Sequence, residues 1–171
     1  EHGVPFSDAD LKILWDNKTN ETAEMLLIMC YSGWRISEYI GLEVNLQKKY
    51  FMGGIKTEAG KGRIVPIHSG ILPLVERRIS KYGKLLPCND KDFRKQMDEL
   101  LNQLGIPGNP KHTPHDCRHT FSMLCEKYEV KENDRKRMMG HSFKADITNK
   151  VYGHRDIEDL RKELEKITID L

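Results

Sequence analysis

Apolar residues recur at helical spacing along most of the chain, so the sequence predicts a mainly α-helical protein. The run ETAEMLLIMC (21–30) is apolar nearly all round, which indicates a buried helix, and Gly33 follows as its cap. In 91–105 the apolar positions lie on one helical face until Gly105 ends the pattern. Shorter amphipathic or capped stretches predict further helices over 6–15, 35–42, 70–83, 114–128, 133–140 and 156–167.

The pattern changes in YFMGGIKTEAGKGRIVPIH (50–68). Two short apolar runs flank a tip rich in glycine, lysine and glutamate, which predicts a β-hairpin with a loop of more than two residues. Pro66 has no N–H to donate, so the second strand should lie at a sheet edge or end early. The expected fold class is α+β, a mostly helical domain with one small antiparallel sheet.

Length and composition fit one domain with a real core, because 171 residues are ordinary for a single unit. The sequence shows no apolar run long enough to span a membrane and no secretory leader, which predicts a cytoplasmic protein without a membrane partner. The four cysteines form no CxxC pair, so free thiols are expected. The net charge of +2 is unevenly distributed, because residues 1–30 hold two lysines and six acidic residues and the remainder is basic. The basic remainder mildly favours binding to a polyanion.

Five of the seven histidines fall in the last 60 residues of the chain, and two of them lie in PHDCRHTFS (114–122). His115 and His119 are four residues apart, so they could face one metal ion on a helix. However, no third ligand follows from spacing, and Arg118 would place a permanent cation beside the ion. A polar helix start without chemistry is the plain alternative.

Taken together, five separated stretches resemble the tyrosine recombinase (phage integrase) family. The stretches are SGWRISEYIGL, GIKTEAGKGRIVPIH, TPHDCRHTF, MMGHS and NKVYGH, in the family's order between about residues 31 and 154. The resemblance implies a recombinase catalytic domain. Its catalytic residues would be Arg35, Lys56, His115, Arg118, His141 and Tyr152.

The resemblance implies that Tyr152 attacks a DNA phosphodiester and forms a 3'-phosphotyrosine bond. Arg35 and Arg118 would stabilise the negative charge on the non-bridging oxygens, for which a planar guanidinium is well suited. His141 would add a hydrogen bond, and His115 would handle the proton of the phenol, whose ordinary pKa is near 10.

The family's hairpin lysine protonates the departing 5'-oxygen. Lys56 fits that place better than its rival Lys61, because it ends the first strand. Glu38 and Asp116 are expected to orient the arginines and His119 to support its helix.

His154 has no assigned role. Each residue also has an ordinary structural explanation, since Arg35 could cap a helix and Tyr152 could be a core ring.

The resemblance further implies no cofactor and no metal, since the covalent bond conserves the energy of the phosphodiester. Expected partners are double-stranded DNA recombination sites, other copies of the chain in a synaptic tetramer, and a directionality factor, with association with the nucleoid when on DNA. The chain is expected to be one catalytic domain (1–171) of a longer integrase, with a tail helix over 156–171. The apolar stripe of that tail could pack on its own domain or, as we prefer from the resemblance, on a neighbouring protomer.

Three other functions remain open at this stage. A type IB topoisomerase uses similar chemistry, although the GH block and the spacing look more like an integrase. A catalytically silent DNA-binding module and a metal-dependent hydrolase are the other two. They differ in whether a covalent adduct forms and in whether a chelator abolishes activity.

Overall fold

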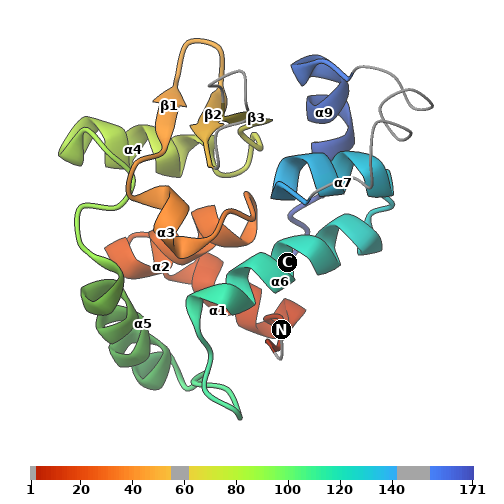
Figure 1. Cartoon of the computed structure of the whole chain (residues 1–171). Coiled ribbons are helices and arrows are strands. Elements are labelled where there is room, and N and C mark those ends of the chain that lie inside the picture. The colour runs from red at the N-terminus through yellow and green to blue at the C-terminus, as the bar shows by residue number, and fades with distance from the viewer. Residues whose placement is uncertain (1–2, 55–61, 142–154) are drawn as a thin grey trace.

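The computed structural model describes residues 3–54, 62–141 and 155–171, and it has the predicted α+β architecture (Figure 1). Helices dominate, and a small sheet lies at one end of the molecule beside α4. The helices are α1 (Asp8–Asp16), α2 (Glu21–Cys30), α3 (Ile36–Tyr39), α4 (Leu72–Tyr82), α5 (Asp90–Leu104), α6 (Pro114–Lys127), α7 (Glu132–Met139) and α9 (Ile157–Leu164). The strands are β1 (Glu43–Asn45), β2 (Tyr50–Gly53) and β3 (Arg63–Pro66).

Helix α2 forms the centre of the core. All its residues from Ala23 to Cys30 are buried, as the apolar pattern predicted. It packs against α1, α4, α5 and α6, so it is enclosed by helices on several sides. Burial of this much apolar surface is the main stabilising contribution to such a fold. The long helix α6 thereby acquires a fixed place beside α2 (Figure 1).

The sheet is antiparallel with the order β1-β2-β3. Phe51 pairs with Val65 across β2 and β3, and both side chains are buried. The predicted hairpin is confirmed, and β3 is an edge strand that ends at Pro66, as the missing N–H requires. Strand β1 was not predicted, because three residues are too few to show an alternating pattern. The hairpin tip lies outside the described residues.

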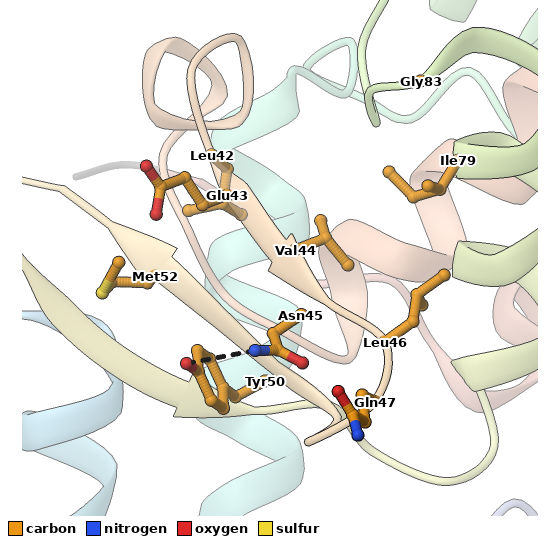
Figure 2. Close-up of a pocket in the computed structure, with 10 residues that line it drawn as sticks. All are labelled: Leu42, Glu43, Val44, Asn45, Leu46, Gln47, Tyr50, Met52, Ile79 and Gly83. Carbon is orange, nitrogen blue, oxygen red and sulfur yellow. Dashed lines mark hydrogen bonds between the residues drawn. The ribbon is translucent and has the colours of Figure 1, made fainter.

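A hollow of about 660 Å³ lies between the sheet and α4. Figure 2 shows that its lining comes from β1, the turn after it, β2 and α4, with the Asn45 amide donating to the Tyr50 hydroxyl at 3.3 Å. The side chains of Val44, Leu46 and Ile79 give it a partly apolar wall. None of the predicted catalytic residues within the described ranges lines this hollow.

The C-terminal segment packs on its own domain. Leu160, Leu164 and Ile167 are buried, and α9 lies against β3 and α7. Glu165 accepts hydrogen bonds from the amide and the hydroxyl of Ser69 at 2.7 and 2.9 Å. The structure therefore shows the plainer of the two interpretations of the apolar stripe, since burial within the chain, rather than docking on a neighbouring protomer, covers it.

The four cysteines are free, as expected. Cys30, Cys117 and Cys125 are buried, and burial raises the pKa of the Cys125 thiol to about 12. These thiols therefore act as small core residues. In the described part of the chain no helix is long and apolar enough to cross a membrane.

Candidate active site

Arg118 joins three segments that are far apart in the sequence. It lies in the first half of α6, is 4% exposed, and donates from Nη1 to the Gly33 carbonyl at 2.7 Å and from Nη2 to the Met139 carbonyl at 2.8 Å. Gly33 stands two residues before Arg35, and Met139 stands two residues before His141. One buried guanidinium thus brings the Arg35 and His141 segments to the same helix.

The loop after α2 approaches α6 closely because Gly33 has no side chain. Its φ is 76°, and a Cβ at this position would lie 2.3 Å from the Phe121 ring. Any other residue would therefore be strained and would push the loop away from α6. The predicted helix-ending glycine also sets the approach of Arg35 to Arg118.

The site carries an excess of positive charge. Burial, together with the nearby cations Arg35 and Arg63, lowers the pKa of Arg118 to about 10, whereas Glu38 acts in the opposite direction. Arg118 still holds its proton at neutral pH, but its charged form is disfavoured by its neighbours. Such a cluster favours an anion among the guanidinium groups.

Arg35 is the N-cap residue of α3, and Glu38 holds it there. The Arg35 amide donates to Glu38 Oε1 at 2.9 Å, and Arg35 Nη1 lies 3.7 Å from the same oxygen. Glu38 thus contacts Arg35, as predicted. Because 45% of the Arg35 side chain stays exposed, its guanidinium is accessible from solvent.

Arg63, at the start of β3, is the residue that the sequence analysis missed. Its guanidinium contacts both carboxylate oxygens of Glu38, at 3.1 and 3.3 Å. Burial alone would raise the pKa of Glu38, but hydrogen bonds from Arg63 and the Arg35 amide outweigh burial and lower the pKa. A cation beside a hairpin tip is usually a solvent-exposed charge. The position of Arg63 within the hairpin stretch was therefore the only sequence signal that could have pointed to its role.

The two predicted histidines belong to different parts of the chain, His115 to α6 and His141 to the segment just after α7. His115 is exposed on the first turn of α6, and its ring meets that of His119 edge to face, with centroids 4.6 Å apart. His141 follows Gly140, which ends α7 with a φ of 75°. Partial burial lowers the pKa of both, helped by His119 and Arg118 for His115 and by Arg118 for His141. Both imidazoles are therefore mainly neutral at pH 7 and able to accept a proton.

Asp116 does not orient an arginine, so that expectation was wrong. Its Oδ2 lies 2.7 Å from His112 Nδ1 and accepts from the Thr113 amide at 3.1 Å, while Oδ1 accepts from the Val4 amide at 3.1 Å. The carboxylate therefore fixes the start of α6 and the N-terminal segment that crosses it. His119 makes its ring contact with His115, and the support of the helix expected of it stays a prediction.

The structure thus brings Arg35, Arg118 and His141 to one place, with His115 one helical turn from Arg118. Four residues singled out from the sequence, Lys56, Lys61, Tyr152 and His154, lie outside the described residues. The roles of these four stay predictions. Across the ranges that the structure describes, no group of three metal-binding side chains is found.

Comparison with known proteins gives consistent results. The sequence model described as the phage integrase family matches residues 8–159. The tyrosine recombinase XerC of Bradyrhizobium diazoefficiens is 30% identical, over 58% of this chain and 36% of that protein. The chain therefore spans about a third of the length of this curated relative.

Two solved structures share the fold. The integrase from mycobacterium phage Brujita has a TM-score of 0.75 at 16% identity, covering 100% of this chain and 60% of that one. The Tn1549 transposon integrase, solved in complex with circular intermediate DNA, has a TM-score of 0.69 at 20% identity. The match covers 96% of this chain and 66% of that one. At these identities the likeness establishes the fold.

Proposed function

Since the chain belongs to the phage integrase family, we propose that it is the catalytic domain of a site-specific DNA recombinase. The domain would cleave and rejoin DNA through a covalent 3'-phosphotyrosine intermediate and so integrate or excise a mobile element. The observation that supports this most is the pair of hydrogen bonds from Arg118 to the Gly33 and Met139 carbonyls, because they bring the Arg35 and His141 segments together.

In the proposed reaction the Tyr152 oxygen attacks the phosphorus, and the bond from phosphorus to the 5'-oxygen breaks. The phenol proton passes to His115, whose lowered pKa leaves it neutral and able to accept. Lys56, with Lys61 as the rival, gives a proton to the leaving 5'-oxygen. A 5'-hydroxyl of another strand then attacks the phosphotyrosine and releases the tyrosine.

The arginines act on the charge that develops during attack. Arg35 has an exposed guanidinium, and Arg118 is held at a fixed place by protein acceptors, so both would meet the non-bridging oxygens without rearrangement. Loss of one such donor typically slows a reaction by about a hundredfold or more. His141, at the end of α7, would add a further hydrogen bond.

We also propose the partners that this chemistry requires. They are double-stranded DNA with recombination sites and further copies of the protein in a synaptic tetramer, with a directionality factor to set the outcome. This chain would then be the catalytic part of a longer integrase.

Covalent trapping tests the proposal directly. The protein is incubated with a pool of nicked duplexes of randomised sequence. After cleavage, the short fragment that ends in the new 5'-hydroxyl diffuses away, so the covalent adduct cannot be religated. The adducts are resolved on denaturing gels and sequenced. We expect an adduct at a defined sequence with the wild type and none with Tyr152→Phe. Tyr50→Phe is the matched control, since that hydroxyl accepts one long hydrogen bond in the sheet.

The same assay separates the rival functions. Relaxation of supercoiled plasmid with adducts at unrelated sequences would favour a type IB topoisomerase. DNA binding without an adduct would indicate a silent binding module, and strand cleavage that a chelator abolishes would indicate a metal-dependent hydrolase. Any of these three results would overturn the proposal.

A further inference from the structure

We infer that Arg63 is a positioning residue of the cleavage centre, which holds the Arg35 segment and the end of α7 in one fixed arrangement. This inference rests on the proposed function and extends it to a residue outside the six predicted catalytic groups.

The guanidinium uses all three nitrogens on protein acceptors. Nε donates to the Met138 carbonyl at 3.0 Å, and Nη1 and Nη2 donate to the two oxygens of Glu38 at 3.1 and 3.3 Å. Glu38 in turn accepts from the Arg35 amide at 2.9 Å. Arg63 therefore connects β3 with the N-cap of α3 and with the last turn of α7, three residues before His141.

Stacking adds a constraint that a different cation would not meet. The Arg63 guanidinium carbon lies 3.8 Å from the centre of the Trp34 ring, and Trp34 precedes Arg35 in the chain. A flat guanidinium can lie on the indole and bridge a carboxylate at the same time, whereas the single ammonium of lysine cannot. The site therefore requires arginine rather than positive charge alone.

Two glycines show that the backbone is fitted to this side chain. Gly54, after β2, and Gly140, after α7, have φ values of 80° and 75°. A Cβ would lie 2.5 Å from Arg63 Nη1 at Gly54 and 2.4 Å from it at Gly140. The backbone thus approaches the same guanidinium nitrogen closely at two places, which is a separate indication that its position is fixed.

We assign Arg63 a positioning role because all three of its guanidinium nitrogens donate to protein acceptors that hold the Arg35 segment and α7. It acts on Arg35 through Glu38 and on His141 through the backbone of α7. A displacement of about 1 Å in a reacting arrangement can cost about a hundredfold in rate. We therefore expect its loss to resemble the loss of Arg35 itself.

The test compares cleavage of a phosphodiester with cleavage of a neutral methylphosphonate at the same position of the trapped sequence. An arginine that offsets charge on a non-bridging oxygen matters less when a methyl group replaces that oxygen. For Arg63→Ala we expect about a hundredfold slower cleavage of the phosphodiester and a much smaller loss on the methylphosphonate, as for Arg35→Ala. Arg63→Lys should stay impaired on the phosphodiester.

Arg77→Ala is the matched control. Arg77, on α4, pairs with the buried carboxylate of Glu24 on α2, so its loss should weaken the fold without touching the cleavage centre. It should slow both substrates by the same factor, if at all. The ratio of the two rates does not depend on the folded fraction, so a destabilised Arg63→Ala still gives an answer.

Three results would overturn the inference. They are wild-type cleavage by Arg63→Ala, equal losses on both substrates, and full rescue by Arg63→Lys. Failure of the wild type to form an adduct with the phosphodiester would instead overturn the proposed function. The two failures are therefore distinguishable in one set of measurements.

Discussion

Alanine at Gly140 should disturb the cleavage centre through Arg63, and alanine at Gly83 provides a matched comparison. Both glycines cap helices with left-handed backbone, at φ 75° and 71°. A Cβ on Gly83 would meet no atom of the described residues within 4 Å, whereas a Cβ on Gly140 would lie 2.4 Å from Arg63 Nη1. The two changes thus share a backbone cost and differ in the contact with Arg63.

The expected magnitudes follow from these two contributions. Alanine in a left-handed conformation costs about 1–2 kcal/mol, and its lower entropy in the unfolded chain offsets about 0.4–1 kcal/mol, so Gly83→Ala should cost about 1 kcal/mol. Gly140→Ala carries the same cost and also displaces Arg63 from Met138 or Glu38. A hydrogen bond to a charged group contributes about 1.5–3 kcal/mol, so the total should be about 3 kcal/mol.

Urea unfolding of both variants, followed by circular dichroism, measures the two free energies of unfolding. Cleavage is measured in parallel on the trapped DNA sequence. Gly140→Ala should lose about three times as much stability as Gly83→Ala and should cleave at least about tenfold more slowly, because Arg63 and His141 shift together. Equal stability losses, together with equal cleavage rates, would refute the reasoning.

Three further predictions concern other parts of the site and fold. Arg118→Lys should slow cleavage by about a hundredfold or more, since an ammonium cannot hold both carbonyls and a phosphate; normal cleavage would contradict this. Below pH 6.5, the ordinary pKa of histidine, the unfolded chain should bind protons at His115 and His141 before the folded protein does. The urea midpoint should therefore decrease as the pH is lowered, and an increase on lowering the pH would count against the lowered pKa values. Leu164→Ala should cost about 2–5 kcal/mol, because this fully buried side chain packs α9 on its own domain; an unchanged midpoint would be inconsistent with that packing.

Much of the fold could be predicted from the sequence because its signals are local. The all-round apolar run of α2, the proline that ends β3 and the glycine that ends α7 each determine the structure within a few residues. Strand β1 could not be predicted in this way. Its three residues pair with β2 only because the turn that follows brings the chain back.

The candidate site, too, contains residues that could be predicted and contacts that could not. Arg35, Arg118 and His141 were predicted as a set from the family resemblance, and the structure brings them together. The partners of Arg63 and Asp116 could not be predicted, since each depends on contacts over long sequence separations. Arg63 reaches Met138 across 75 residues, and Asp116 reaches Val4 across 112.

Among the residues that the structure describes, three guanidinium groups and one carboxylate meet at this site, and this unequal balance has a thermodynamic consequence. In the free protein Arg35, Arg63 and Arg118 repel one another, and the depressed pKa of Arg118 records part of that repulsion. A phosphodiester lying among them turns the repulsion into attraction. Ligand occupancy and heat resistance are therefore linked, and the DNA that the protein is proposed to cut should also raise its melting temperature.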